Sequence, residues 1–196
     1  MEAIETPTAK TETAQNSIEH IKAYANIPKR YKDAKFEART KEQEELIKKI
    51  RANISGRKIS EVHDMLIFGK IGTGKTHVLC GLLNTLIETE VYCRYVTEFE
   101  LLELYSRKEF VKYDAFKEVA FLVIDELGKD NLQDWQKKQI EELISYRYNE
   151  MLPTIFVTNL TTDEFKHFIG DRAIDRMRDN KIIRVSLVGD SLRGAI

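Results

Sequence analysis

Residues 65–77 read MLIFGKIGTGKTH, and this stretch decides the fold of the chain. Residues 65–68 form an apolar run of strand length, and residues 69–76 match the phosphate-binding loop pattern G-x-x-x-x-G-K-[ST]. Strand, loop and helix in this order aim the N-terminus of a helix at a phosphate group. The helix is indicated over residues 76–90 by apolar side chains at helical spacing, namely Val78, Leu79, Leu82, Leu83 and Leu86.

Each fixed position of the loop has a chemical role. The glycines let the backbone N–H groups face a polyphosphate, Lys75 places a positive charge on the β- and γ-phosphates, and the Thr76 hydroxyl is a ligand for Mg²⁺. The alternative is a glycine-rich turn with an incidental lysine, and the flanking strand and helix argue against it. We therefore expect the chain to bind a nucleoside triphosphate.

Bulk composition leaves the partner open. Lys and Arg number 31 and Asp and Glu 32 among 196 residues, so any contact with nucleic acid must come from a local patch. The apolar runs are strand-sized and the N-terminus is polar, so we expect neither a membrane span nor a signal peptide. Cys80 and Cys93 fall inside predicted elements, which favours buried, reduced thiols in a cytoplasmic protein.

The rest of the chain alternates between strand and helix patterns. Residues 1–16 are polar and without period, so we expect disorder there, followed by a short helix over residues 17–24. Alternation of this kind predicts βαβ units and a parallel sheet. The expected strands are 65–68, 91–96, 119–124, 154–158 and 182–185, and the expected helices are 40–50, 76–90, 98–108 and 134–150, the last with Ile140, Leu143, Ile144 and Tyr148 facing inward.

Two acids close the apolar run FLVIDE, residues 121–126. In a parallel sheet, ligands gather at the carboxyl ends of the strands, where Asp125 and Glu126 would lie. We expect Asp125 to hold the Mg²⁺ of the nucleotide and Glu126 to polarise an attacking water. The alternative is a surface turn that happens to carry two acids.

A third polar group follows the run IFVT, residues 155–158. Asn159 at the end of this strand is placed to hydrogen-bond the γ-phosphate or the lytic water. An Asn at this position is also typical of a helix cap near Thr161 or Thr162. The residues alone leave the two interpretations even.

Arginines four residues apart lie on one face of a predicted helix, residues 170–178. Arg172 and Arg176 on that face could reach the nucleotide site of a neighbouring subunit. Spacing alone favours the alternative, ion pairs of Arg172 with Asp175 and of Arg176 with Asp179 on a solvated helix.

Assembled in this order, the segments resemble AAA+ ATPases of the DnaC/DnaI helicase-loader group and the related IstB transposition helpers. The resemblance runs from Ile27 almost to the C-terminus. It rests on IPKRYKDAKFE (27–37), GKIGTGKTH (69–77), VIDELG (123–128), ISYRYNE (144–150), PTIFVTNL (153–160), IGDRAIDRMRD (169–179) and VGDSLR (188–193).

The resemblance implies roles for individual residues. It makes Asn159 the sensor 1 residue, Arg176 the arginine finger with Arg172 as its nearest competitor, and Arg193 the sensor 2 residue. It also places residues 27–31 beside the adenine. The nucleotide-binding set that it implies is Gly69, Lys70, Ile71, Gly72, Thr73, Gly74, Lys75, Thr76 and His77.

In this group, the segment between the second and third strands also contacts single-stranded DNA. Here the segment is short, but basic and aromatic residues alternate in it, which suits backbone charge together with base stacking. An ordinary connector between helix and strand is an equal alternative. The candidate DNA-binding residues are Lys108, Phe110, Lys112, Tyr113 and Lys117.

We predict a three-layer α/β P-loop domain of AAA+ type, with a five-stranded parallel sheet, over residues 27–196. Residues 1–26 form a disordered or short helical extension, and few residues follow Arg193, so we expect no separate lid domain. The predicted function is an ATP- and Mg²⁺-dependent ATPase that loads the replicative hexameric helicase and self-associates on ATP or DNA. An IstB-type transposition helper and a non-hydrolysing partner-binding protein are the alternatives, and a small-molecule kinase suits the strand ends less well.

Overall fold

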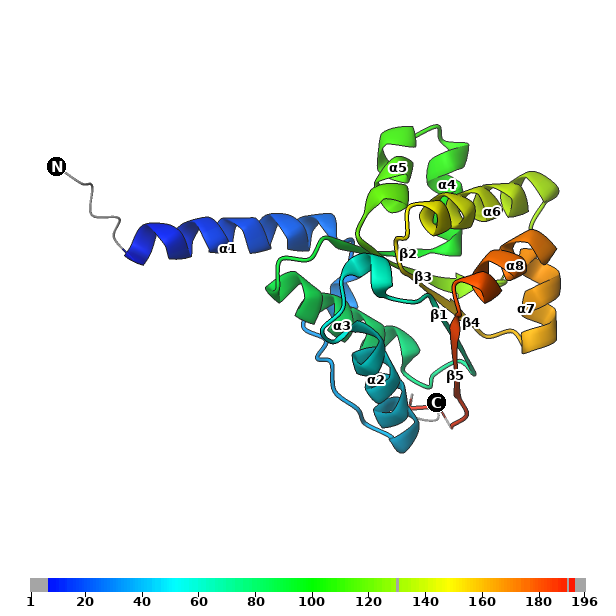
Figure 1. The fold of residues 1–196 in the computed structure, drawn as a ribbon, viewed down its shortest axis with the longest axis horizontal. Coiled ribbons are helices and arrows are strands. Elements are labelled where there is room, and N and C mark those ends of the chain that lie inside the picture. The colour runs from blue at the N-terminus through cyan, green and yellow to red at the C-terminus, as the bar shows by residue number, and fades with distance from the viewer. Residues whose placement is uncertain (1–6, 130, 190, 193–196) are drawn as a thin grey trace.

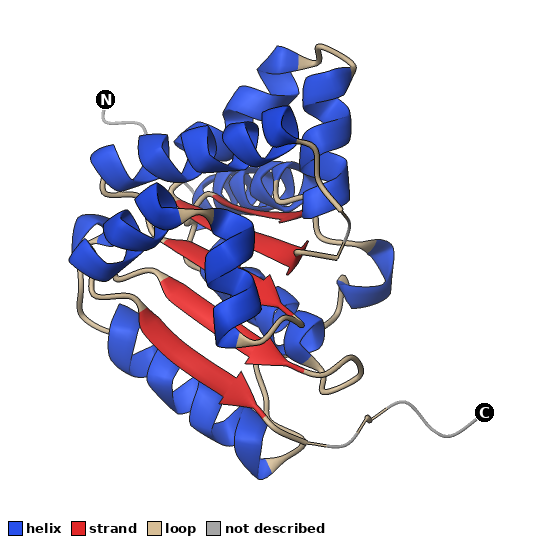
Figure 2. Cartoon of the chain, turned by 90° about the vertical axis from the view of Figure 1, so that its right-hand side faces the viewer, coloured by secondary structure: helices blue, strands red, loops and turns tan. Residues whose placement is uncertain are grey.

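Five parallel strands form one sheet at the centre of the molecule. The computed structural model describes residues 7–129, 131–189 and 191–192. All neighbouring strands run parallel, and Figure 2 shows their arrowheads on one side of the sheet, so the loops that follow them meet at one edge. The strands are β1 (Met65–Gly69), β2 (Cys93–Thr97), β3 (Phe121–Leu127), β4 (Thr154–Thr158) and β5 (Ile183–Leu187), in the order β2-β3-β4-β1-β5.

Helices cover both faces of this sheet and give three layers (Figure 1). The first part of the chain and the P-loop helix cover one face, and the later helices cover the other. This arrangement confirms the predicted α/β fold. The described helices are α1 (Pro7–Tyr24), α2 (Lys41–Ile54), α3 (Lys75–Glu88), α4 (Glu98–Ser106), α5 (Phe110–Glu118), α6 (Asp134–Asn149), α7 (Thr162–Ile169) and α8 (Asp171–Asp179), with short 3₁₀ turns at Lys29–Tyr31 and Ile59–Glu61.

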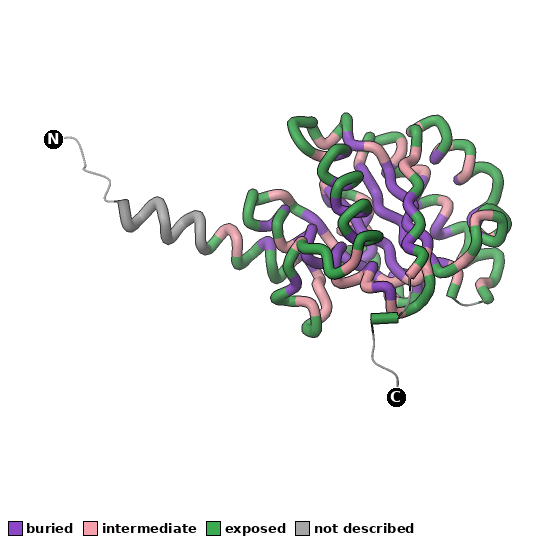
Figure 3. Tube along the Cα trace, turned by 90° about the horizontal axis from the view of Figure 1, so that it is seen from below, coloured by how far each residue is buried: buried purple, intermediate pink, exposed green. Residues whose placement is uncertain are grey.

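The core consists of two apolar clusters separated by the sheet. Alternate residues of a strand point to opposite faces, so Met65 and Ile67 of β1 enter the cluster with α2 and α3, whereas Leu66 and Phe68 enter the cluster with α4 to α8. Figure 3 shows the buried strands between exposed helical surfaces. Cys80 and Cys93 are both buried free thiols, as the sequence predicts.

The N-terminal helix is longer than the sequence predicts. We expected disorder to residue 16, but α1 begins at Pro7 and projects from the side of the body (Figure 1). Pro is well suited to the first position of a helix, because the N–H that it lacks has no partner there. Polar residues without an apolar period gave no signal for this part of the helix. The first six residues lie outside the described part of the chain.

A helix also replaces the predicted connector between α4 and β3. Residues 110–118 form α5, because Phe116 and Tyr113 are spaced to bury themselves against the neighbouring helices. The other predicted elements are confirmed, with ends that differ by a few residues. In the described ranges, no helix has both the length and the apolar character that crossing a membrane requires.

A buried arginine fastens the amino ends of the strands. The Arg147 side chain on α6 is only 1% exposed, and its guanidinium donates to the carbonyl oxygens of Phe116, Lys117, Val119 and Pro153 at 2.8–3.0 Å and to Thr154 Oγ1 at 2.8 Å. Burial lowers the pKa of Arg147, and the nearby Asp64 opposes that shift. The end of α5 and the beginnings of β3 and β4 are thus held by one side chain.

Candidate nucleotide-binding site

The P-loop connects β1 to α3 through two glycines with left-handed backbone. Gly72 has φ 89° and Gly74 has φ 82°, a region that side-chain-bearing residues rarely adopt. A β-carbon at Gly74 would also collide with the Gln43 side chain, and one at Gly72 would collide with Ser191. The loop therefore requires glycine at both positions. The N–H groups in the first turn of α3 have no partner inside the helix, and they face the interior of this loop.

Lys75 at the start of α3 reaches across the mouth of this loop. Its ammonium donates to the carbonyl oxygens of Gly69 at 2.5 Å and Lys70 at 2.9 Å, and to Asn159 Oδ1 at 2.9 Å. Lys75 is only 8% exposed, and burial lowers its pKa, an effect that Asp125 opposes. A compact positive charge is thus held between the loop and the end of β4.

Thr76 and Asp125 offer oxygen ligands for a divalent cation. The Thr76 hydroxyl donates to Asp125 Oδ2 at 2.7 Å, and Asp125 is only 4% exposed. A hydroxyl and a carboxylate are hard oxygen donors of the kind that Mg²⁺ prefers beside nucleotide phosphates. The donor set therefore fits Mg²⁺.

Glu126 occupies a bulge at the end of β3. The register of β3 against β4 shifts between Ile124 and Leu127, and Glu126 has a left-handed φ of 60°. Bulges of this kind redirect side chains beside active sites. The Glu126 carboxylate points to the surface of the site, where Lys129 Nζ lies 3.1 Å from its Oε2 atom.

Asn159 faces the P-loop rather than the next helix. Its side-chain oxygen accepts the hydrogen bond from Lys75, whereas the N-cap of α7 is Thr161, with Glu164 completing the capping box. The structure thus contradicts the capping interpretation of Asn159. The sensor role stays a prediction.

One cavity of about 580 Å³ is lined by most of the residues predicted to bind or hydrolyse the nucleotide. Tyr31 and His77 also line it, with ring centroids 6.3 Å apart in an edge-to-face contact. Burial lowers the pKa of His77, and Arg39 adds to this effect. The other predicted residues in its lining are Ile71, Gly72, Gly74, Lys75, Thr76, Asp125, Glu126 and Asn159, joined by Arg30 from the segment expected beside adenine.

Some predicted residues lie elsewhere. Lys70 and Thr73 line a neighbouring cavity, and Arg193 lies outside the described residues. Arg172 and Arg176 lie on α8 and do not belong to the described lining of the P-loop cavity. Neither predicted ion pair of this helix forms in the described structure. Arg176 instead donates to the Arg172 carbonyl oxygen at 3.3 Å, and Asp179 accepts from the Tyr148 hydroxyl.

The candidate DNA-binding segment is packed more tightly than we expected. Tyr113 is 2% exposed and its hydroxyl donates to the Gln139 carbonyl oxygen, so it has no free face for base stacking. Phe110 is 48% exposed at the start of α5. Lys112 pairs with Glu109 and Lys117 with Asp114. Tyr113 must therefore be removed from the predicted set, while Phe110 and the lysines stay on the surface.

Sequence reasoning missed three buried polar residues around the site. Gln43 on α2 donates to the Thr73 carbonyl oxygen at 2.8 Å, Tyr95 on β2 donates to Asp125 Oδ2 at 2.9 Å, and Glu98 accepts from the Gly128 N–H at 2.7 Å. Burial, followed by the charge of Asp125, raises the pKa of Tyr95, so the hydroxyl keeps its proton at neutral pH. None of the three belongs to a recognisable motif, because each contact forms only when two elements that are distant in sequence pack against each other.

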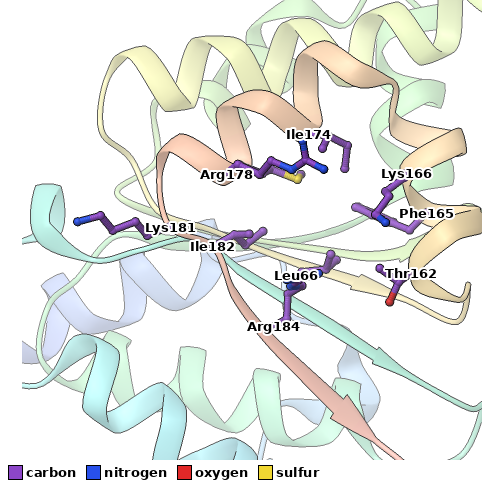
Figure 4. A pocket seen from close by; sticks show the side chains of 10 residues that line it. Leu66, Thr162, Phe165, Lys166, Ile174, Arg178, Lys181, Ile182 and Arg184 are labelled. Carbon is purple, nitrogen blue, oxygen red and sulfur yellow. The ribbon is translucent and has the colours of Figure 1, made fainter.

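A second cavity, of about 520 Å³, lies between β1, β5, α7 and α8 (Figure 4). Apolar residues in its lining include Leu66 and Phe165, and the charged residues are Lys166, Arg178, Lys181 and Arg184. The described lining includes none of the predicted nucleotide-binding residues. The P-loop cavity is therefore the candidate nucleotide site.

Comparison with solved structures confirms the fold. The crystal structure of DnaI superposes with a TM-score of 0.73 and 20% identity, covering 89% of this chain and all of that one (100%). The crystal structure of the DnaC helicase loader gives 0.67 and 22%, covering 81% and 99%. AMPPCP-bound DnaA from Aquifex aeolicus gives 0.65 and 14%, covering 81% and 51%. All share the P-loop architecture described above.

Replicative helicase loaders are among the proteins whose sequences are similar to this chain. The replicative helicase loader DnaI of Bacillus subtilis (strain 168) is 32% identical over 109 residues, 53% of this chain and 35% of that protein. The loader DnaC of Escherichia coli (strain K12) is 26% identical over 144 residues, 69% and 58%. The chain thus spans less than two thirds of the length of these relatives. The family model described as IstB-like ATP binding protein matches residues 7–194, and the chain therefore belongs to that family.

Proposed function

We propose that this chain binds ATP together with Mg²⁺ in the P-loop cavity and hydrolyses it. The observation that carries the proposal is the convergence of Lys75, Thr76, Asp125, Glu126 and Asn159 on one cavity. Membership in an ATP-binding family and the fold shared with a nucleotide-bound DnaA structure support it.

Each side chain has a task in this proposal. Lys75 and the loop N–H groups bind the phosphates, and Thr76 with Asp125 holds Mg²⁺, which when bound neutralises charge on the β- and γ-phosphates. Glu126 orients the attacking water and accepts its proton. Asn159, 2.9 Å from the Lys75 ammonium, is placed to contact the γ-phosphate from the other side.

The proposed reaction also requires an arginine from a second copy of the chain. Arg176 lies on α8, outside the described lining of its own cavity. An arginine finger supplied in trans contributes about 10³–10⁵-fold to hydrolysis in related chemistry. We propose that ATP or DNA drives self-association and brings Arg176 of one copy, or Arg172 one turn earlier, into the cavity of the next. Arg193 is proposed to contact the nucleotide from its own chain.

We propose a role in DNA replication in the cytoplasm, with the replicative hexameric helicase as partner. The support is the similarity to DnaI and DnaC, both named replicative helicase loaders. Contact with single-stranded DNA would use Phe110, the exposed Lys108 and Lys112, and the half-buried Lys117. Stacking on Phe110 and neutralisation of phosphates together suit binding without base specificity.

A transposition helper is the second candidate, because the family model that matches is named after IstB. The test is binding of the purified chain to a purified hexameric helicase from the same host, measured by size-exclusion chromatography with ATP. A stable complex would support the loader. A complex with a transposase but not with the helicase would support the transposition helper. Absence of turnover in either complex would support the non-hydrolysing alternative.

Lys75→Ala tests the nucleotide site itself. Loss of the ammonium should weaken ATP binding more than tenfold, which corresponds to about 1.4 kcal/mol, while the circular dichroism spectrum stays unchanged. Lys137→Ala is the matched control, because the Lys137 side chain is exposed on α6 and does not line the P-loop cavity. Isothermal titration calorimetry measures both variants. Affinity within tenfold of wild type for Lys75→Ala would show that the phosphate assignment is wrong.

A further inference from the structure

The carboxylate of Asp125 is oriented by more than the P-loop. Its Oδ2 atom accepts from the Thr76 hydroxyl at 2.7 Å and from the Tyr95 hydroxyl at 2.9 Å, and its Oδ1 atom accepts from the Glu126 N–H at 2.7 Å. Thr76 lies on α3 and Glu126 lies on β3 with Asp125 itself, whereas Tyr95 lies on the neighbouring strand β2. Its ring is buried in the core between the sheet and α3, so the hydroxyl has little freedom to move.

Tyr95 is in turn held by the segment that follows α1. The N–H of Tyr95 donates to the Ala25 carbonyl oxygen at 2.9 Å, and its carbonyl oxygen accepts from Asn26 Nδ2 at 2.9 Å. The same Asn26 amide reaches Glu100 Oε1 on α4 at 3.0 Å. Asn26 has a left-handed φ of 56°, which turns the chain sharply from α1 toward the sheet. The end of α1 is therefore fastened to the residue that contacts Asp125.

Hydrogen bonds to a metal-binding carboxylate fix its orientation, and their removal commonly lowers metal affinity 10–100-fold. Thr76 is itself a proposed ligand, so Tyr95 is the side chain that orients Asp125 without contacting the metal. A displacement of residues 25–26 would shift the backbone of Tyr95 and, through its hydroxyl, the carboxylate.

We infer that Tyr95 is a positioning residue for Mg²⁺ binding by Asp125, and that the Ala25–Asn26 turn couples the attachment of α1 to Mg²⁺ affinity. This inference rests on the proposed function, because it concerns regulation of the same nucleotide site. A partner that pulled α1 away from β2 would lower the Mg²⁺ affinity through Tyr95 and Asp125, without contacting the cavity.

The test separates metal affinity from nucleotide affinity. ADP binding to the full chain is measured by calorimetry in EDTA and then across a Mg²⁺ titration. Tyr95→Phe keeps the ring and removes the hydroxyl, so it should raise the Mg²⁺ concentration at half-effect about 10–100-fold and leave affinity in EDTA within twofold. Asn26→Gly keeps the left-handed backbone and removes the amide, so it should shift the midpoint in the same direction by a smaller factor.

Tyr113→Phe is the control, because it removes an equally buried hydroxyl that bonds to Gln139 instead. It should leave the Mg²⁺ midpoint unchanged. An unchanged midpoint in Tyr95→Phe, with wild type responding to Mg²⁺, would overturn the inference and leave the proposed function intact. Equal losses in EDTA and Mg²⁺ would assign Tyr95 a structural role only, and an unshifted Asn26→Gly would overturn the coupling to α1. Failure of wild type to bind ADP would instead overturn the proposed function.

Discussion

At the scale of single residues, two adjacent acids have very different surroundings. Asp125 is buried and accepts hydrogen bonds from three donors, whereas Glu126 is half-exposed and pairs with Lys129 at the surface. A fixed carboxylate suits a metal ligand, because its geometry does not change when the ion arrives. A partly exposed carboxylate in the lining of the cavity suits proton transfer from water.

We expect Glu126→Gln to bind ATP almost as wild type and to hydrolyse it about 10²–10⁴-fold more slowly, because an amide cannot accept the proton. Asp125→Asn should instead weaken nucleotide binding only when Mg²⁺ is present. Steady-state phosphate release and calorimetry measure the two effects. Glu103→Gln on α4 is the conservative control away from the cavity. Wild-type turnover in Glu126→Gln would remove this residue from the mechanism.

Sequence motifs located the P-loop, the two acids near the end of β3 and Asn159, because each lies within a few residues of a strand end. Tyr95 could not be found in this way. Its hydroxyl meets Asp125 only because β2 pairs with β3 in a register that places Thr97 beside Asp125. Gln43 has the same origin, since its contact with Thr73 depends on how α2 packs against the P-loop.

At the scale of elements, periodicity predicted the strands and most helices but misplaced one side chain of α6. Tyr148 was expected to face inward, yet it is only partly buried and its hydroxyl meets Asp179 on α8. The buried position next to it belongs to Arg147, a charged residue that an apolar pattern assigns to the surface. The carbonyl oxygens that make its burial favourable come from segments distant in sequence.

Arg147→Met should lower the free energy of unfolding by roughly 3–5 kcal/mol, as when one partner of a buried charged contact is removed. Methionine fills much of the volume but removes the guanidinium that donates to four carbonyl oxygens and the Thr154 hydroxyl. The Pro153 carbonyl oxygen keeps a longer hydrogen bond from the Leu122 N–H at 3.3 Å. Urea denaturation measures the change. Arg107→Met, which removes an exposed ion pair with Glu103, should cost less than about 1 kcal/mol. Equal costs for the two variants would contradict the proposed importance of burial.

At the scale of the whole molecule, the candidate nucleotide site and the buried Arg147 cluster lie at opposite ends of the sheet. The P-loop, Asp125 and Asn159 lie at the carboxyl ends of their strands, whereas Arg147 bonds to groups at the amino ends of β3 and β4. Parallel strands make this separation, because all their carboxyl ends meet at one edge. The candidate site and the Arg147 hydrogen bonds therefore lie at opposite edges of the sheet.

Arg176→Ala should bind ATP normally and hydrolyse it poorly, because its own pocket is intact and the arginine it supplies to a neighbour is missing. Mixing it with Glu126→Gln should restore part of the turnover, since some interfaces then pair an intact pocket with an intact arginine. The restoration should increase with protein concentration. Normal turnover by Arg176→Ala alone, without rescue in any mixture, would contradict an arginine in trans. The same behaviour in Arg172→Ala would place the finger one turn earlier.

The turn that holds Tyr95 also occupies backbone groups at an outer edge of the sheet. β2 is an outer strand of the sheet, and the outward N–H and C=O of Tyr95 are already bonded to Ala25 and Asn26. An outer strand with free backbone groups is a template for pairing with a strand of another chain, and such pairing leads to aggregates. Residues 25–26 occupy that template at its centre. A copy of the chain that approached β2 along this side would therefore find the central backbone groups of the strand already bonded.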